Sequence, residues 1–375
     1  MIPAVIAVGV LAVVMIPIAW LTRALARRVV GVAPRRKVIV AHKVDDDVEL
    51  PTSTLTKASG NYGLWFGPNL SEHALIGDIE RSDEMGVRRP ILSATAPMPS
   101  SPFEVQLTGH LAHSPEVIDP NWEDIAIPLR AGSVAPAWLF RATDASAPWV
   151  IHVQGIRTSR LVTLRSVEAA MRVGLTSLAI TYRGSGDGPT APVSYLGERE
   201  WTDLADAIEY AESHGAREVH VVAWSMGAGL ALELLRQDPS AFQRLALIAP
   251  ATDWKSIVRH GVDRAGLPAI AASIVTWALS SPIGSRVVGM PAPLDFGRLN
   301  WIDGYRLSVP TLVVHSSGDE EIPFELTKRF ADAHPQVTLV ETATAPHGWE
   351  ANVDPQLFQS ALTEWLSPQS PDSNA

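Results

Sequence analysis

Ala223-Trp224-Ser225-Met226-Gly227 is the stretch that decides how this chain folds. It closes an apolar run that begins at Glu218 and opens an apolar stretch of helical spacing that ends near Leu235. Ser225 therefore stands on a tight strand-to-helix turn, which strains the serine backbone and needs small residues two positions away on each side. The same short sequence also occurs where a serine only caps a helix, so the rest of the chain has to decide between the two interpretations.

Two polar loops follow buried strands further along the chain. The run 310–315 predicts a short strand, and the loop after it carries Asp319. The run 337–341 predicts the next strand, and the loop after it carries His347. Glu320 and Glu321 adjoin the aspartate, but only Asp319 has a glycine before it and an Ile-Pro pair three residues after it. His152 and His315 lie inside apolar strands, where a histidine is more often a core residue than a catalyst.

The order serine, acid, histidine, each at the carboxyl end of a successive strand, resembles that of α/β-hydrolases, and the resemblance covers about 149–366. It implies an α/β fold, with a mostly parallel sheet and helices on both faces. It also implies that His347 takes the proton of Ser225 and later delivers it to the leaving group, while Asp319 orients the imidazole. We expect an acyl-serine intermediate. No metal and no cofactor are expected.

The resemblance also indicates an oxyanion hole, which needs two backbone N–H groups aimed at the developing negative charge. The first is expected from Met226, directly after the nucleophile, and the second from Ile156 in the loop after the strand 149–153. Family members usually have His-Gly in this loop, whereas this chain has Gln154-Gly155, which keeps the glycine and the backbone geometry. The predicted substrate-binding residues are Gln154, Gly155 and Trp224. Ala223 replaces the usual first glycine of the turn, and its small side chain meets the same physical requirement.

The first residues of the chain predict a membrane anchor at 1–22. No charged residue occurs between Ile2 and Leu21, and at about 1.5 Å per residue this stretch reaches the roughly 30 Å of a bilayer core. A signal peptide would carry basic residues before the apolar run, and here six basic residues follow it instead. This bias predicts a single-pass cell-membrane protein with its catalytic domain in the cytoplasm. The alternative is a buried or amphipathic helix of a soluble protein.

Charge is divided unevenly along the chain, whose formal net charge is −10. Seven basic residues and no acidic residue precede Asp45, so the acidic excess lies entirely after it. The acidic body argues against nucleic acid as a partner, and the basic stretch 23–44 is interpreted as a juxtamembrane linker that contacts membrane lipid. The chain has no cysteine, which excludes thiol catalysis and disulfides. The oligomeric state is left open.

The remaining segments predict four further parts. Short apolar runs broken by turn residues indicate a β-rich accessory region at 45–124, before a hydrolase domain at 125–366. A cap is expected at about 251–305, and a polar, disordered tail at 367–375. Five apolar residues of the cap either line an acyl pocket above Ser225 or simply pack on the core: Ile270, Ile274, Val275, Trp277 and Leu279.

The best-supported function is a membrane-anchored serine hydrolase that cleaves a small-molecule carboxylic ester or thioester with a hydrophobic acyl group. One alternative is a serine peptidase of the prolyl-oligopeptidase type, although the region before the hydrolase domain is too short for a full propeller. The other alternative is a catalytically silent hydrolase fold that acts as a binding module. His110 and His113 lie near two acidic residues, but no helix aligns them for a metal site.

Overall fold

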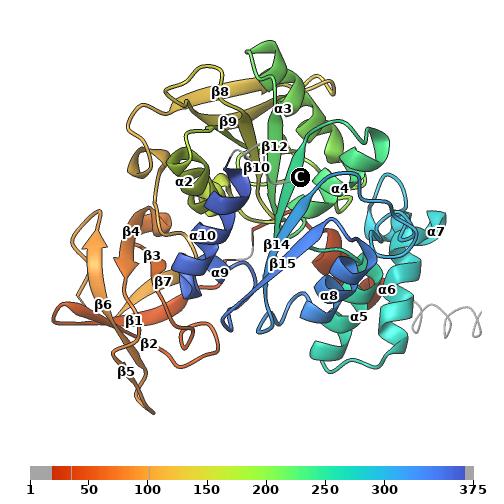
Figure 1. Ribbon diagram of the computed structural model, residues 1–375. Coiled ribbons are helices and arrows are strands. Elements are labelled where there is room, and N and C mark those ends of the chain that lie inside the picture. Colours follow the sequence, from red (N-terminus) through yellow and green to blue (C-terminus); the bar gives the residue numbers. More distant parts are fainter. Residues whose placement is uncertain (1–18, 35, 101, 368–375) are drawn as a thin grey trace, which may run out of the picture.

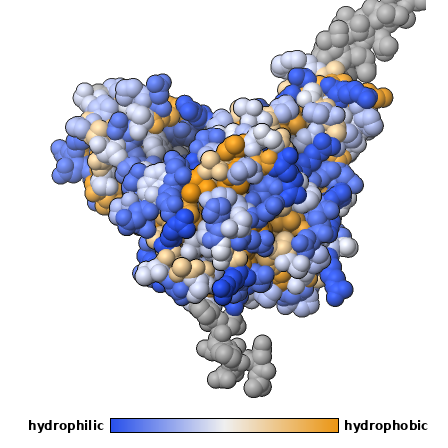
Figure 2. Space-filling model, turned by 90° about the horizontal axis from the view of Figure 1, so that it is seen from above, coloured by the Kyte–Doolittle hydropathy of each residue, from blue (hydrophilic) through white to orange (hydrophobic). Residues whose placement is uncertain are grey.

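Two β-sheets organise the chain in the computed structural model, which describes residues 19–34, 36–100 and 102–367 (Figure 1). The first sheet belongs to an N-terminal barrel and the second to the larger C-terminal domain. Seen from above, the barrel forms a lobe of its own beside that domain (Figure 2). The catalytic candidates all lie in the C-terminal domain.

The larger sheet has eight strands in the order β15-β14-β13-β12-β10-β11-β9-β8. Strands β10 to β15 are parallel to one another, and β9 pairs antiparallel with both β11 and β8. This is the strand arrangement expected of the α/β-hydrolase fold, and the carboxyl ends of the parallel strands meet at one edge. The strands are β8 (Glu123–Pro128), β9 (Val134–Phe140), β10 (Trp149–Val153), β11 (Thr176–Ile180), β12 (Val219–Trp224), β13 (Arg244–Ile248), β14 (Thr311–Ser316) and β15 (Val337–Thr342).

Helices cover both faces of this sheet. Successive side chains of its central strands point to opposite faces, and both sets are apolar, so each face packs against a layer of helices. In β12, Val221 and Ala223 belong to the core under one helical layer, whereas Val222 and Trp224 belong to the core under the other. Burial on both faces explains why the strand sequences are continuously apolar. The layer helices are α2 (Leu164–Arg172) and α10 (Pro355–Leu366) on the Trp224 side and α3 (Trp201–Ser213), α4 (Gly227–Gln237) and α8 (Phe324–Ala333) on the other, with the short α9 (Glu350–Val353) before α10.

The N-terminal sheet closes on itself into an antiparallel barrel. Its strand order is β2-β1-β7-β3-β4-β6, and β2 pairs with β6 to complete the ring, while the short β5 pairs with β6. Alternating side chains such as Tyr62, Leu64 and Phe66 fill its interior. The strands are β1 (Ile39–Val44), β2 (Asp47–Leu50), β3 (Tyr62–Phe66), β4 (Glu72–Ile76), β5 (Arg81–Ser82), β6 (Val87–Ala94) and β7 (Phe103–Thr108). A short 3-10 helix, η1 (Pro68–Leu70), lies between β3 and β4, and two others follow the barrel in the chain, η2 (Pro115–Val117) and η3 (Arg160–Thr163).

A helical cap follows β13, formed by α5 (Trp254–Arg264), α6 (Ile270–Ser280) and α7 (Pro282–Val288). A helix at residues 19–30 lies against this cap (Figure 1). Ala26 and Val30 of this helix are fully buried, and Arg27 donates hydrogen bonds to the carbonyls of Val288 and Pro192. The stretch 23–44, interpreted from the sequence as a linker, therefore contains a packed helix and the first barrel strand.

Two sequence predictions fall on residues outside the described part. The predicted anchor at 1–22 lies mostly in residues 1–18, and the predicted tail at 367–375 lies mostly in residues 368–375. Across the described ranges, none of the helices combines the length and the apolar character that a bilayer crossing requires.

Candidate active site

Ser225 occupies the tight turn between β12 and α4, and its backbone is strained. Its φ is 52°, in the left-handed region that side chains with a Cβ adopt at a cost. The turn is packed closely against the loop after β10: a Cβ at Gly227 would lie 2.7 Å from the carbonyl oxygen of Gln154, and one at Gly155 would lie 3.0 Å from Cβ of Ser225. Close approach of the loop after β10 therefore requires glycine at 227, and the tight contact with Ser225 favours glycine at 155.

The three residues predicted as a triad lie in one hydrogen-bonded line. Nε2 of His347 is 2.8 Å from Oγ of Ser225, and Nδ1 of His347 is 2.6 Å from Oδ2 of Asp319. Because a carboxylate can only accept, the Nδ1 that faces it carries a proton, and Nε2 faces the hydroxyl. This is the tautomer that can take the proton of Ser225.

Asp319 is held ionised by several donors. Its Oδ1 accepts hydrogen bonds from the backbone N–H groups of Glu321 and Ile322, at 2.7 and 2.9 Å. Its Oδ2 also accepts from Nε2 of His315 at 2.9 Å, and Nδ1 of His315 accepts from the hydroxyl of Thr327 at 2.7 Å. Burial favours the neutral acid, but the charge of His347 and the hydrogen bonds of both histidines lower the pKa of Asp319 well below its ordinary value.

The carboxylates around His347 favour its protonated form. Burial opposes the charge on the imidazole, but Asp319 outweighs it and raises the pKa of His347 to about 9. A second buried acid, Glu350, lies behind this pair. Burial, together with the charge of Asp319, raises the pKa of Glu350 to about 7, and neither of its oxygens has a hydrogen-bond partner on another described residue.

The predicted oxyanion-hole residues lie beside the nucleophile. Met226 follows Ser225 as the N-cap residue of α4, and Ile156 lies on the loop that presses Gly155 against the serine. That loop is held from below, where the hydroxyl of Tyr182 donates to the carbonyl of Gly155 at 2.9 Å. Both residues thus lie next to Ser225 or on the loop that contacts it, and their part in an oxyanion hole stays a prediction.

The three predicted substrate-binding residues have different positions. Gly155 and Trp224 line a cavity that reaches Ser225. Gln154 is fully buried, and its Nε2 donates to the hydroxyl of Ser185 at 3.3 Å. Its amide therefore supports the loop after β10 from inside the protein.

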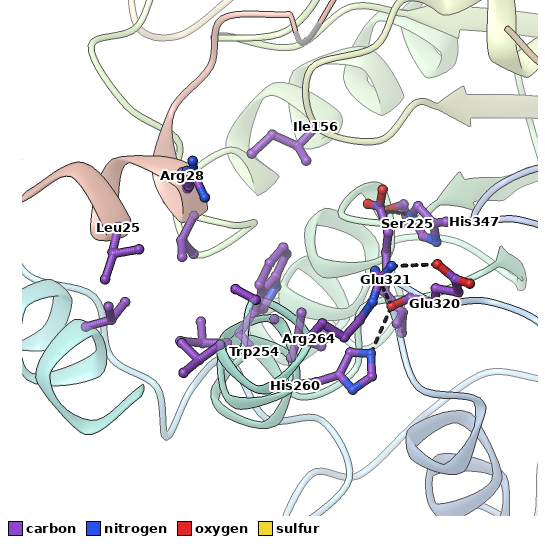
Figure 3. A pocket seen from close by; sticks show the side chains of 18 of the residues that line it. Leu25, Arg28, Ile156, Ser225, Trp254, His260, Arg264, Glu320, Glu321 and His347 are labelled. Carbon is purple, nitrogen blue, oxygen red and sulfur yellow. Dashed lines mark hydrogen bonds and ion pairs between the residues drawn. The ribbon is translucent and has the colours of Figure 1, made fainter. Parts of the chain in front are cut away.

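Two cavities meet at Ser225 and His347. The first, the cap pocket, has a volume of about 320 Å³ and lies between helix 19–30 and the cap. Leu25 and Arg28 lie on helix 19–30, across the cavity from Ser225 and His347 (Figure 3). Its apolar wall comes mainly from α5, through Trp254, Ile257, Val258 and Val262.

The expectation for the cap residues is corrected by their positions. Of the five apolar residues considered for an acyl pocket, only Val275 lines the cap pocket. Leu279 is buried in the core. Ile270, Ile274 and Trp277 are 64%, 37% and 55% exposed, because they lie on the outer face of α6. The inner wall is built by α5 instead, which the sequence did not single out.

The second cavity, the barrel pocket, has a volume of about 380 Å³ and lies between the barrel and the hydrolase domain. The end of β7 and the residues after it form one wall, through Gln106, Thr108 and His110. The loop after His347 forms another, with Gly348 and Trp349. The barrel thus lines a cavity that extends to Ser225, although the sequence suggested no role for it.

The barrel also contacts the loop that carries His347. Trp349 lies with its ring centroid 4.6 Å from that of Tyr62. Nδ2 of Asn352 donates to the carbonyls of Asn61 and Gly109, at 2.7 and 3.2 Å. His347 is therefore positioned partly by contacts with a separate lobe.

Sequence reasoning missed the part that His315 has in this site. His315 was interpreted as a core histidine, and it is buried but also bonds the triad acid. Its position four residues before Asp319 was the available signal. His315, Asp319 and Glu350 have ligand atoms within 4.8 Å of one another, but the oxygen of Asp319 that faces His315 also accepts from His347, and we assign no metal there.

Comparisons with known proteins agree with the fold. A family model described as "alpha/beta hydrolase fold" matches residues 148–267, and one described as a domain of unknown function (DUF8805) matches residues 39–108, which is the barrel. A search of curated proteins found no match.

Solved structures give the same result for the larger domain. The esterase Pf2001 of Pyrococcus furiosus aligns with a TM-score of 0.52 at 19% identity, over 68% of this chain and 95% of the esterase. Est1E of Butyrivibrio proteoclasticus, in a structure with ferulic acid bound, aligns with a TM-score of 0.50 at 15% identity, over 64% and 97% of the two chains. At these identities the likeness establishes the α/β-hydrolase fold alone.

Proposed function

We propose that this protein is a serine hydrolase that cleaves a carboxylic ester or thioester through an acyl-Ser225 intermediate. The observation that carries the proposal is the unbroken line from the Ser225 hydroxyl through His347 to the ionised Asp319. In the first step Oγ of Ser225 bonds to the acyl carbon, its proton passes to Nε2 of His347, and the leaving group departs with that proton. Water then repeats the sequence and releases the acid.

The strained backbone of Ser225 supports catalysis over a silent binding role. A serine held at a φ of 52° costs free energy that a binding scaffold has no physical reason to retain. The strain lifts the hydroxyl to the point where the two cavities meet. The alternative of a propeller-type peptidase is not favoured, because the N-terminal sheet closes as a six-stranded barrel.

Labelling with a fluorophosphonate probe tests the proposal. The native protein is expected to be labelled covalently at Ser225, and the Ser225→Ala variant is expected to remain unlabelled. Ser177→Ala is a matched control that is expected to remain labelled, since Ser177 is a buried serine of β11 that lines neither of the two cavities. A folded native protein without labelling, or labelling that survives Ser225→Ala, would refute the serine mechanism.

The proposal includes a location at a membrane, with the catalytic domain on the cytoplasmic side and membrane lipid as a partner. It is supported by the uncharged sequence from Ile2 to Leu21 and by an apolar surface beside its end. Of the thirteen large apolar side chains that are exposed in the described part of the chain, seven lie on α6, α7 and the start of helix 19–30. They are Trp20, Leu21, Ile270, Ile274, Trp277, Ile283 and Val287.

The apolar surface formed by these seven side chains adjoins the cap pocket. Arg23 donates to the carbonyl of Val287 at 2.5 Å, so the start of helix 19–30 lies against α7. Helix α6 presents Val275 to the cap pocket and Ile270, Ile274 and Trp277 to the outside. An apolar acyl chain could therefore pass from the bilayer into the pocket along a single helix.

Substituting the outer face of α6 tests the location. The double variant Ile270→Glu, Trp277→Glu is expected to slow hydrolysis of an ester embedded in vesicles more than hydrolysis of a dissolved short-chain ester. Val117→Glu is the control, because Val117 is 52% exposed on a different part of the surface. Equal effects on both esters would argue against a membrane-facing cap.

A further inference from the structure

The barrel pocket differs in charge from the protein that surrounds it. The chain carries a formal net charge of −10, yet three arginines line this pocket, Arg36, Arg157 and Arg165. Among the residues that the structure describes, none of those lining it is an aspartate or a glutamate. A cationic cavity at the nucleophile of an acidic protein points to an anionic ligand.

Arg165 is the most constrained of the three. It is 4% exposed, and its guanidinium carbon lies 4.9 Å from the centroid of the Trp224 ring. It donates to the side-chain oxygen of Asn352 and lies 3.5 Å from the carbonyl of Gly348, and both of these acceptors are neutral. In the described part of the chain, no carboxylate oxygen lies within 4.0 Å of this guanidinium.

The charge of Arg165 persists despite its burial. Burial lowers the pKa of Arg165 to about 10, and Glu350 partly offsets that effect, so the side chain stays cationic at neutral pH. A buried cation without a close counter-ion is costly, and an anion in the adjacent cavity would relieve that cost. Arg36 lies exposed at the same pocket, where it can meet the same anion.

The position of the pocket indicates which half of the substrate enters it. His347 delivers its proton to the leaving group, so the leaving group must lie on the side of that histidine. The barrel pocket contains Gly348 and Trp349, which follow His347 directly, whereas the cap pocket contains no other residue of that loop in the described part. The cap pocket supplies apolar walls suited to an acyl chain.

We propose that the barrel pocket binds the leaving-group half of the substrate, and that this half is an alcohol or thiol carrying a phosphate or carboxylate. The proposal rests on the serine-hydrolase function given above. Arg165 and Arg36 bind the anion, and the end of β7 supplies a neutral polar wall through Gln106, Thr108 and His110. The barrel is thus the part of the protein that selects the leaving group.

A matched pair of esters tests this. The acyl chain is the same in both, and the leaving groups are 4-hydroxybenzoate, which is anionic, and 4-hydroxybenzamide, which is neutral. Each kcat/KM is divided by the rate of that ester with hydroxide, which removes the difference in leaving-group reactivity. One charge-assisted contact corresponds to a preference of about tenfold or more for the anionic ester.

Substitutions of the two arginines locate the preference. Arg36→Gln and Arg165→Gln are each expected to lower the anionic-to-neutral ratio about tenfold, and Arg165→Lys is expected to retain part of it. Arg329→Gln, a substitution of an exposed arginine paired with Asp303, is the control and is expected to keep the ratio. Because Arg36 is exposed, Arg36→Gln remains informative if the Arg165 variant fails to fold.

The results separate this inference from the function on which it rests. Equal normalised rates for the two esters in a protein that is labelled at Ser225 would overturn the anionic leaving group and leave the hydrolase intact. A preference that both glutamine variants retain would overturn the arginine assignment. As a measurement independent of turnover, free 4-hydroxybenzoate is expected to slow fluorophosphonate labelling of the native protein more than 4-hydroxybenzamide does, and equal protection would count against the site.

Discussion

Replacing Ser225 by glycine is expected to abolish hydrolysis while making the fold more stable than the alanine variant. Ser225 has a φ of 52°, a region that glycine enters freely and alanine does not. Both substitutions remove Oγ and with it the 2.8 Å contact to His347. The difference between the two variants therefore isolates the strain of the backbone at the turn.

The magnitude follows from two opposing effects. A residue with a Cβ in the left-handed region costs about 1–2 kcal/mol, which glycine avoids. Glycine also gives the unfolded chain more freedom, which offsets about 0.4–1 kcal/mol of that gain. The glycine variant should therefore be more stable than the alanine variant by about 1 kcal/mol, or about 2 °C in Tm for a domain of this size.

Thermal unfolding followed by circular dichroism measures the difference. The same pair of substitutions at Ser316, a buried serine of β14 without a positive φ, is the control, and there alanine should be the more stable variant. A glycine variant at Ser225 that is no more stable than the alanine variant would show that the turn stores no strain, and the argument for a catalytic serine from backbone geometry would fail.

The remaining predictions concern the triad and the barrel. The value of kcat/KM should rise with pH towards about 9, because only neutral His347 can accept the proton and its pKa is raised to about 9. Asp319→Asn removes the charge that raises this pKa, so the residual activity should have its midpoint at lower pH; a rate independent of pH between 6 and 9 in the native protein would contradict the assignment. The raised pKa of His347 also contributes stability that is complete below its ordinary value of about 6.5 and is lost as the pH rises to about 9. Asn352→Ala removes two hydrogen bonds to barrel carbonyls and one from Arg165, so denaturant unfolding should show a loss of about 3 kcal/mol, whereas the exposed Asn121→Ala should show little change. Arg89→Met leaves the carbonyls of Thr56, Ala58, Gly60 and Gly77 without their buried donor, which should destabilise the barrel by about 4 kcal/mol; an unchanged barrel transition in protease-resistance measurements would refute it.

The sequence predicted the α/β-hydrolase fold and three side chains that the structure brings into contact, because both are encoded locally. Each triad residue follows a short apolar strand, and the carboxyl ends of parallel strands meet at one edge of a sheet. The contacts of Ser225, His347 and Asp319 could therefore be expected from strand order alone. Gly227 carried the same information, since the close approach of the loop after β10 leaves no room for a Cβ there.

Only the tertiary structure decided what surrounds the triad. The barrel closes through pairing of Asp47–Leu50 with Val87–Pro90, and its far end then reaches the pocket beside His347; pairing between distant segments leaves no local pattern in the sequence. The same holds for helix 19–30, whose apolar and basic residues predicted a membrane contact but whose packed face lines the cap pocket. Both the outer and the inner face of α6 carry large apolar side chains, and only packing against α5 and α7 decides which of them are buried and which remain exposed.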